Sequence, residues 1–255
     1  MEAKPTVVVV PAKLDLEKEI CTFLVQLSKK VLSTKERFNV AFSGGSLPSI
    51  VASFLADRED VEFSKWHVYF ADERCCPLDH PDSNYLLVKA ELLDRVKIPS
   101  SNVHAINPEL VNDPEKAAAD YQSVIEKELP LNDQGIPVFD CILLGIGPDG
   151  HTCSLFPNYP QVQETKKFVT HILDSPKPPP SRITLTLPVL NSASSVVFVI
   201  SGSGKTETID QIFHKPEEKK PASFVNPGPG KLFWLVDKSA SAHIDYLAKP
   251  VSQYW

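Results

Sequence analysis

The chain has 255 residues, 42% of them hydrophobic, which is enough apolar material to bury a core in one domain. Its formal net charge is −6 and it contains no basic block, so nucleic acid is not an expected partner. The five scattered cysteines argue against a disulfide framework. Because we find neither a signal peptide nor a run approaching the ~20 apolar residues of a membrane span, we expect no membrane association and a cytoplasmic location.

Strands and helices are predicted to alternate along the chain. Short runs of β-branched and aromatic residues indicate strands, and apolar residues three or four positions apart indicate helices. The first half contains predicted strands at Thr6–Val10, Asn39–Phe42, Trp66–Ala71 and Val103–Ile106, and predicted helices over Leu16–Val31, Leu47–Leu55, Ser83–Leu93 and from Asp113 to Leu129. The second half contains predicted strands at Phe139–Leu144, Phe168–Leu173, Ile183–Leu187, Ser195–Ile200 and Leu232–Val236, and helices from Thr206 to Phe213 and over Ser239–Leu247. This alternation is typical of an α/β fold with a mostly parallel sheet.

A glycine turn follows the second predicted strand. Ser43-Gly44-Gly45-Ser46 lies between that strand and the helix at Leu47–Leu55. A strand, a glycine turn and a helix N-terminus in this order can direct backbone N–H groups at an anion. An ordinary strand-to-helix turn remains the alternative for this motif by itself.

Charged residues follow the next predicted strand. Asp72-Glu73-Arg74 comes at its carboxyl end, where open parallel sheets bind their ligands. Such a charged triplet is more often solvated than functional. It becomes a candidate site only if other functional residues lie beside it in the fold.

The most informative stretch is Phe139–Pro157, FDCILLGIGPDGHTCSLFP. An apolar run ends in a tight loop of glycines and proline, and His151 follows directly, at the carboxyl end of a predicted strand. The glycines also match the G-x-G-x-x-G pattern of dinucleotide sites. Asp149 beside a pyrophosphate, and Pro157 and Pro160 where the helix should run, argue against that interpretation.

Two further basic residues lie near turns. Arg182 starts a predicted strand, after a stiff stretch with four prolines at Ser175–Pro180. Lys205 follows Ser201-Gly202-Ser203-Gly204, which resembles a nucleotide-binding P-loop but has Val199 where that motif needs glycine. A single phosphate therefore suits this loop better than a nucleoside triphosphate.

Several blocks, taken in order, resemble the 6-phosphogluconolactonases, which are related to the glucosamine-6-phosphate deaminases. The blocks cover nearly the whole chain: SGGS at 43–46, FADER at 70–74, DSNY at 82–85, GIGPDGHTCSLFP at 145–157, SRITLTLP at 181–188, GSGK at 202–205 and PAS at 221–223. The resemblance implies a Rossmann-like three-layer sandwich with a mostly parallel sheet and a few extra strands, with residues 1–255 as one catalytic domain. It also implies hydrolysis of 6-phospho-D-glucono-1,5-lactone to 6-phosphogluconate, in the oxidative pentose phosphate pathway.

That reaction assigns roles to nine residues of the chain. His151 is the expected general base, since histidine is mostly neutral yet basic at cellular pH. Asp149 or Asp72 would orient its imidazole, and the sequence does not choose between them. Arg74 would bind substrate or the developing oxyanion. The expected phosphate-binding residues are Gly44, Gly45, Ser46, Arg182 and Lys205.

Two competing functions and one competing mechanism can be weighed against the same residues. A sugar-phosphate deaminase would carry an acid soon after the histidine, but no carboxylate appears between His151 and Glu164. A covalent route through Cys153 or Ser154 lacks the surrounding nucleophile motif. A non-catalytic sugar-phosphate sensor would not need His151 beside an aspartate. The lactonase scheme requires no cofactor and no metal, adjacent Cys75-Cys76 lacks zinc spacing, and the expected partner is a small-molecule lactone, with no obligate protein partner.

Overall fold

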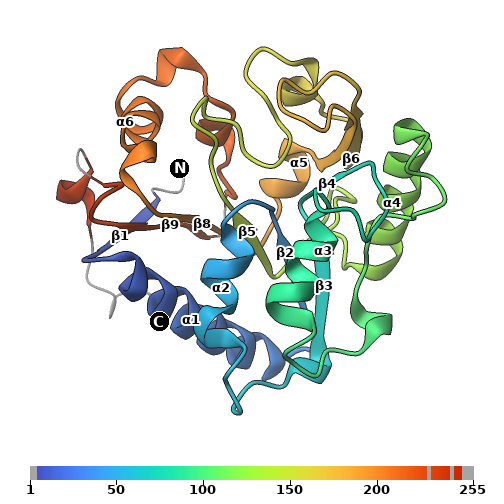
Figure 1. Ribbon diagram of the computed structural model, residues 1–255, viewed down its shortest axis with the longest axis horizontal. Coiled ribbons are helices and arrows are strands. Elements are labelled where there is room, and N and C mark those ends of the chain that lie inside the picture. The colour runs from blue at the N-terminus through green and yellow to red at the C-terminus, as the bar shows by residue number, and fades with distance from the viewer. Residues whose placement is uncertain (1–4, 229–230, 242–243, 249–255) are drawn as a thin grey trace.

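The computed structural model describes residues 5–228, 231–241 and 244–248 and contains two sheets (Figure 1). In the larger sheet, six parallel strands run in the order β1-β9-β8-β5-β2-β3, and a second sheet has the antiparallel order β4-β7-β6. The strands are β1 Thr6–Val10, β2 Phe38–Phe42, β3 Trp66–Phe70, β4 Asp72–Arg74, β5 Cys141–Leu144, β6 Val169–Ile172, β7 Arg182–Leu185, β8 Ser195–Ile200 and β9 Lys231–Asp237. The α-helices are α1 Lys13–Leu32, α2 Leu47–Leu55, α3 Asn84–Val88, α4 Pro114–Glu128, α5 Leu187–Leu190 and α6 Thr206–His214.

The larger sheet is buried on both faces. Successive strand residues point to opposite faces, so neighbours such as Val7 and Val8, or Ala41 and Val40, belong to different core clusters. One cluster joins the sheet to α1, α2 and α3, and the other joins it to α4, α5, α6 and the second sheet (Figure 1). Burial on both faces explains why the strands are continuous apolar runs, and it confirms the predicted three-layer α/β fold.

The second sheet departs from the simple strand-helix alternation. The predicted strands near residues 168–173 and 183–187 form, but they pair antiparallel with each other outside the parallel sheet. Asp72–Arg74, expected at the end of a strand, is itself the strand β4 and pairs with β7. The chain changes sheets at Ala71, whose N–H bonds to Phe42 and whose carbonyl accepts from Leu185. The charged triplet is therefore fixed by backbone pairing.

Two helices begin with side-chain caps. The Ser83 hydroxyl accepts a hydrogen bond from Leu86 N at the start of α3, and the Asp113 carboxylate accepts one from Lys116 N at the start of α4. The strand predicted at Val103–Ile106 is wrong, since this segment contributes a single bridge between Val103 and Val68. The helix predicted over Ser239–Leu247 includes residues 242–243, outside the described residues, and the described part contains a 3-10 turn at Asp245–Leu247.

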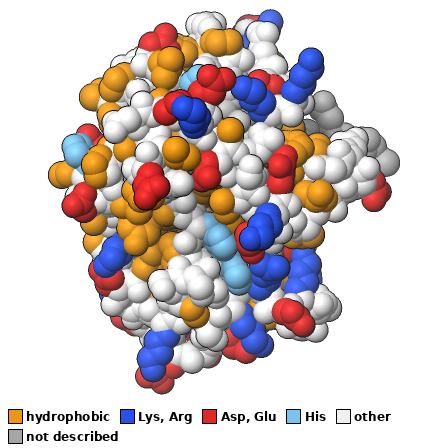
Figure 2. Space-filling model, turned by 90° about the vertical axis from the view of Figure 1, so that its right-hand side faces the viewer, with side chains coloured by type: hydrophobic (Ala, Val, Ile, Leu, Met, Phe, Trp, Pro, Cys, Tyr) orange, Lys and Arg blue, Asp and Glu red, His pale blue; other side chains and the backbone are white. Residues whose placement is uncertain are grey.

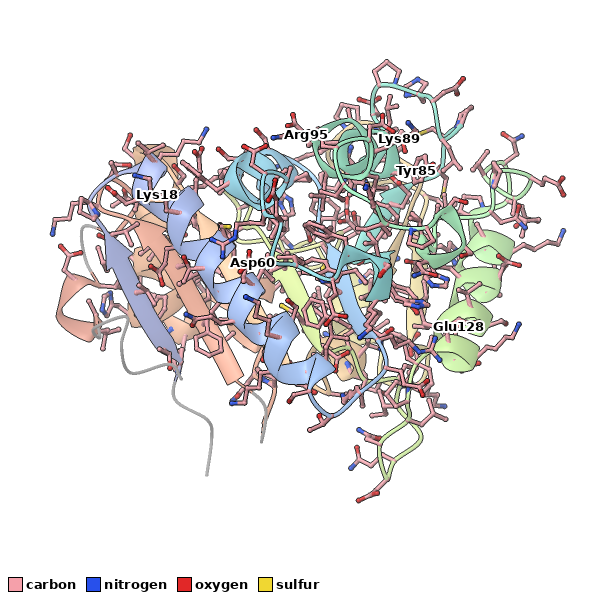
Figure 3. All side chains as sticks on the ribbon, turned by 90° about the horizontal axis from the view of Figure 1, so that it is seen from below. Lys18, Asp60, Tyr85, Lys89, Arg95 and Glu128 are labelled. Carbon is pink, nitrogen blue, oxygen red and sulfur yellow. The ribbon has the colours of Figure 1, made fainter. Side chains whose placement is uncertain are left out.

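Charged side chains of both signs are scattered over the outside of the protein. Figure 3 shows Lys18 on α1 and Glu128 at the end of α4, and Figure 2 shows basic and acidic side chains intermixed on one face. Exposed pairs such as Arg95 with Asp57, at 3.2 Å, add little to stability because water screens them. Within the described ranges, no helix is both long and apolar enough to cross a bilayer.

A pair of histidines connects β3, which contains His67, to the segment that contains His104. His67 Nδ1 and His104 Nε2 are 3.1 Å apart, and the His104 ring stacks on Tyr69 with centroids 4.3 Å apart. Burial, and then the charge of His67, lower the pKa of His104 to about 4. An unfolded histidine titrates near 6.5, so the unfolded chain binds more protons than the folded one between these values. The contribution of His104 to stability is present above about pH 6.5 and is lost as pH falls through about 4.

We therefore expect a His104→Phe variant to lose less stability on acidification than the parent protein. Phenylalanine fills the same space against Tyr69 and takes up no proton. The measurement is the urea unfolding free energy at pH 7 and at about pH 4.5, between the folded and unfolded titration ranges. The same acid-induced loss in both proteins would contradict this account of the histidine pair.

Candidate active site

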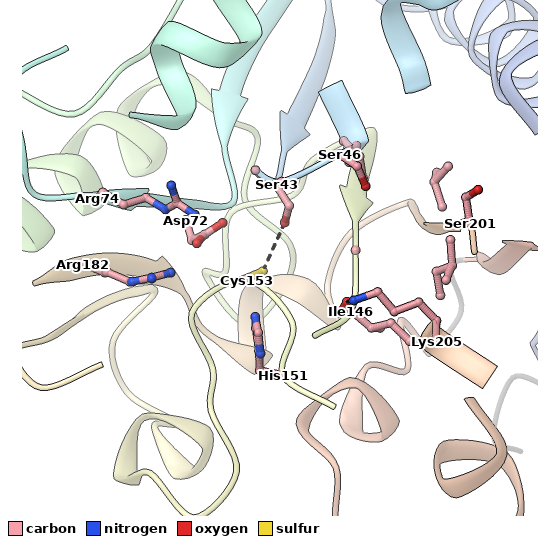
Figure 4. A pocket seen from close by; sticks show the side chains of 16 residues that line it. Ser43, Ser46, Asp72, Arg74, Ile146, His151, Cys153, Arg182, Ser201 and Lys205 are labelled. Atoms are coloured by element: carbon pink, nitrogen blue, oxygen red, sulfur yellow. Dashed lines mark hydrogen bonds between the residues drawn. The ribbon is translucent and has the colours of Figure 1, made fainter. Parts of the chain in front are cut away.

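A cavity of about 190 Å³ lies at the carboxyl ends of β2, β5 and β8 and is closed on one side by β4 and β7 (Figure 4). This is where open α/β sheets bind ligands. Its volume is below the roughly 300–1,000 Å³ of sites for drug-sized ligands, so a small metabolite suits it. Its lining includes eight of the nine predicted site residues: Gly44, Gly45, Ser46, Asp72, Arg74, His151, Arg182 and Lys205.

His151 is presented by a tight turn after β5. Gly147 N donates to His151 O at 2.8 Å, and Gly150 N donates to Gly147 O at 3.0 Å. A Cβ atom at Gly147 would lie 2.0 Å from two atoms of the imidazole ring, so this position has room only for glycine. Gly150 has φ +85°, which also favours glycine. The glycines are therefore needed to hold the histidine ring close to the backbone of the turn.

Asp149, the ninth predicted residue, contacts that imidazole directly. His151 Nδ1 lies 2.5 Å from Asp149 Oδ1. Burial alone would raise the pKa of Asp149, but the hydrogen bond and charge of His151 and the charge of Lys177 bring it well below its usual range. The ionised carboxylate fixes the imidazole with Nδ1–H toward Asp149. The other ring nitrogen, Nε2, is then free to accept a proton.

Asp72 has different partners. Its side chain accepts a hydrogen bond of 2.7 Å from the Ser154 hydroxyl, and Asn84 Nδ2 lies 3.4 Å from its other oxygen. Asp72, Asn84 and Ser154 are all buried. The sequence did not decide which of the two carboxylates orients His151. In the structure, Asp149 contacts the His151 imidazole, and Asp72 lies across the cavity, where its carboxylate can accept a substrate hydroxyl.

The glycine turn at 43–46 forms as predicted. Gly45 has φ +72°, and the turn leads directly into α2. A Cβ atom on Gly44 would lie 1.9 Å from Asn84 Oδ1, so the backbone here packs directly on the Asn84 side chain. Asn84 thereby connects the turn to Asp72, whose carbonyl accepts from Asn84 Nδ2 at 2.8 Å. Asn84, which connects the glycine turn to Asp72, was not predicted as a site residue.

Two arginines reach the cavity from the second sheet (Figure 4). Arg74 Nη1 donates to the carbonyl of Asp82, and its buried Nε–H has no partner among the described residues. Arg182 Nε donates to Pro179 O, and its Nη2 donates to the carbonyls of Lys177 and Pro178. Its Nη1 lies 3.4 Å from Ser154 Oγ. Arg182 therefore anchors the proline-rich loop as well as bringing a positive charge to the cavity.

Lys205 approaches from the larger sheet. Its Nζ donates to Ile146 O at 2.9 Å. Burial, and then the charge of Lys177, lower the pKa of Lys205. The loop before it is anchored by Asp237 at the end of β9, which accepts hydrogen bonds from Ser201 Oγ and Gly202 N. Cations from both sheets thus face the same cavity, which suits an anionic ligand.

The two side chains considered for a covalent route are poorly placed to be nucleophiles. Cys153 lines the cavity, but burial raises the pKa of its thiol well above the usual value, so it stays protonated. Ser154 is fully buried, and its hydroxyl donates to Asp72 and not to His151. The Cys153 thiol is protonated and the Ser154 hydroxyl does not line the cavity, so the geometry favours attack by water.

The same geometry bears on a dinucleotide site, a ring-opening acid and a metal site. No helix begins at Gly150: residues 151–159 form turns before a short 3-10 turn at Pro160–Gln163, so a dinucleotide would lack its helix N-terminus. Glu164, the first carboxylate after His151, accepts hydrogen bonds from Lys166 N and Lys167 N and does not line the cavity. Across the described ranges, no three His, Cys, Asp or Glu side chains gather as a metal site.

Comparison with known proteins gives a consistent picture. The family described as glucosamine-6-phosphate isomerases/6-phosphogluconolactonase matches residues 11–234. The human 6-phosphogluconolactonase is 47% identical over 212 residues, 81% of each chain. A probable 6-phosphogluconolactonase of Schizosaccharomyces pombe is 40% identical over 89% of this chain and 91% of its own. The structure of 6-phosphogluconolactonase from Trypanosoma cruzi superposes with a TM-score of 0.86 at 28% identity, covering 96% of this chain and 98% of its own.

Proposed function

The chain belongs to the family of glucosamine-6-phosphate isomerases and 6-phosphogluconolactonases, and we propose that it hydrolyses 6-phospho-D-glucono-1,5-lactone to 6-phospho-D-gluconate. This is the second step of the oxidative pentose phosphate pathway. The observation that carries the proposal within the structure is His151, paired with Asp149, in a small cavity faced by Arg74, Arg182 and Lys205.

In the proposed mechanism, His151 Nε2 accepts a proton from a water molecule as that water attacks the lactone carbonyl carbon. Asp149 stabilises the imidazolium that forms, through the hydrogen bond to Nδ1. The tetrahedral intermediate then collapses, the bond from the carbonyl carbon to the ring oxygen breaks, and the imidazolium returns the proton to that oxygen. The product carries a carboxylic acid, which ionises, and the histidine is neutral again.

The cationic groups supply the remaining requirements of the reaction. Arg74 lines the cavity, and the positive charge of its guanidinium suits the negative charge developing on the carbonyl oxygen. The phosphate is assigned to the N–H groups of Gly44, Gly45 and Ser46 together with the charges of Lys205 and Arg182. Holding the phosphate places the carbonyl in front of His151, which is how remote binding assists the chemical step.

Lactone hydrolysis is favoured over the isomerase activity that also belongs to this family. The relatives at 40–47% identity over most of the chain carry the name 6-phosphogluconolactonase. The position that would carry a ring-opening acid lies among Cys153, Ser154 and Leu155, where there is no carboxylate. A sensor without chemistry would have no use for the His151–Asp149 pair, and its presence supports an enzyme.

The proposed partner is the sugar-phosphate lactone itself, with no obligate protein partner. The proposed compartment is the cytoplasm, although relatives from rice are named as chloroplastic. Fluorescent tagging of the natural protein would check this location.

The test of the function is a coupled assay with the purified protein. Glucose-6-phosphate dehydrogenase generates the lactone, and 6-phosphogluconate dehydrogenase reports its hydrolysis after subtraction of the spontaneous rate. We expect rapid hydrolysis of the phosphorylated lactone. Unphosphorylated gluconolactone, whose hydrolysis is followed by the acid it releases, should be a poor substrate because it cannot use Lys205 and the glycine turn. Release of ammonia from glucosamine-6-phosphate, without lactonase activity, would instead establish the isomerase reaction.

A further inference from the structure

The loop between β6 and β7 brings Lys177 to the His151–Asp149 pair. This loop contains four prolines at Ser175–Pro180, and the carbonyls of residues 177–179 accept three hydrogen bonds from the buried Arg182. Ser175 Oγ accepts a further hydrogen bond from Lys177 N at 3.3 Å. The backbone at Lys177 is thus held from two sides, which limits where its side chain can reach.

The Lys177 side chain meets the carboxylate that orients the histidine. Lys177 Nζ lies 3.7 Å from Asp149 Oδ1, the same oxygen that lies 2.5 Å from His151 Nδ1. A cation and an imidazole therefore share one carboxylate oxygen. The positive charge of Lys177 disfavours protonation of His151 in two ways. It repels a second positive charge on the imidazole, and it neutralises part of the negative charge of Asp149, which would otherwise stabilise the imidazolium.

We propose that Lys177 is a positioning residue of the proposed lactonase site: by sharing Asp149 with His151, it keeps the histidine neutral, and able to accept a proton, down to lower pH. The proposal rests on the proposed function for its catalytic meaning. Its electrostatic part concerns the free protein and can be measured without substrate.

Besides Lys177, charged groups near His151 come from its own turn, from the loop after β8 and from the segment that contains Lys220. On its own turn, Asp149 favours the imidazolium. Lys205, from the loop after β8, opposes it, but the Lys205 ammonium is hydrogen-bonded to Ile146 O. Lys220, whose stem packs against Gly150, is paired with Glu218 at 3.2 Å.

Across the cavity, the charges of the second sheet offset one another. Arg182 lies over the face of Phe156, which packs on the His151 ring with centroids 4.6 Å apart. Asp72 lies in the same buried network as Arg182, joined through Ser154. Lys177 is thus the cation in direct contact with Asp149, which is why it is the residue to change.

The test is an NMR titration of ¹³C-labelled histidines in the substrate-free protein, with the His151 signal assigned from its loss in His151→Gln. We expect Lys177→Met to raise the midpoint of the His151 titration by about half a pH unit, the scale for one partly screened charge nearby. Lys177→Arg keeps the charge and should keep the parental midpoint. Lys30 is an exposed residue of α1 far from the site, so Lys30→Met makes the same change in net charge and should also leave the midpoint unchanged.

Kinetics provide the second arm of this test. In Lys177→Met, the acid limb of kcat/KM should move to higher pH by the same amount, for phosphorylated and unphosphorylated lactone alike. A rise in KM confined to the phosphorylated lactone, with the His151 midpoint unchanged, would overturn the proposal and make Lys177 a phosphate contact. A shifted midpoint in a protein without lactonase activity would retain the electrostatic inference and reject the proposed function.

Discussion

Replacing His151 by alanine is expected to lower kcat by roughly two to four orders of magnitude, the usual contribution of a positioned general base. The substituted chain should still fold, because the hydrogen bond from Gly147 N to His151 O uses only backbone atoms. Product binding should survive, since Lys205, Arg182 and the turn at 43–46 remain. The coupled assay measures the rate, and calorimetry with 6-phosphogluconate measures binding.

The acid limb of the rate profile gives a second measurement for this residue. In the parent, kcat should fall as His151 takes up a proton, and this limb should disappear in His151→Ala. Asp149→Asn tests the partner of His151 separately, because it keeps the shape of the side chain and removes the charge that holds the imidazole tautomer. A folded His151→Ala protein with near-parental kcat would exclude the mechanism, and Asp72 would become the candidate base.

The second large effect is expected for Arg182→Ala. This change removes a buried cation that donates to three loop carbonyls and contacts Ser154. We expect KM to rise by roughly 30- to 100-fold, equivalent to losing one charge-assisted hydrogen bond. We also expect the free energy of unfolding to fall by about 2–4 kcal/mol, because three partly buried carbonyls lose the buried cation that donates to them. Steady-state kinetics and urea denaturation measure the two effects.

Two variants separate binding from stability at this residue. Arg182→Lys keeps the charge without the planar fork, so it should lose most of the loop anchoring. Lys205→Ala removes a less buried cation that makes one bond to Ile146 O, so it should raise KM with a much smaller loss of stability. If Arg182→Ala left both KM and the unfolding free energy unchanged, the anchoring and phosphate assignments would both be wrong.

The larger sheet and the His151 turn could be predicted from sequence because their signals are local. Strands buried on both faces are short apolar runs, and β1 and β8 have the predicted bounds. His151 follows Asp149 by two residues on a glycine turn, which makes their contact possible without knowledge of the remaining fold. The turn at 43–46 likewise carries its information in its own glycines.

The second sheet explains what could not be predicted. β4 pairs with β7, which lies far along the chain, and β4 has only three residues, all charged. Without that pairing, nothing in the sequence shows that Asp72 accepts a hydrogen bond from Ser154, so the sequence could not exclude Asp72 as the partner of His151. Lys177 was not predicted as a site residue for the same reason. Its proline-rich stretch predicts only a stiff loop, and the position of that loop depends on hydrogen bonds from Arg182.

The order of strands in the larger sheet has a consequence for how the protein is made on the ribosome. β1 is synthesised first, but it pairs with β9, so that Thr6 lies beside Phe233. The N–H and C=O groups of β1 that pair with β9 therefore stay without this partner until most of the chain has emerged from the ribosome. β2, β3 and β5 are closer in sequence and can associate earlier. Asp237, which anchors the loop before Lys205, arrives with β9, so the cavity acquires this anchor only near the end of translation.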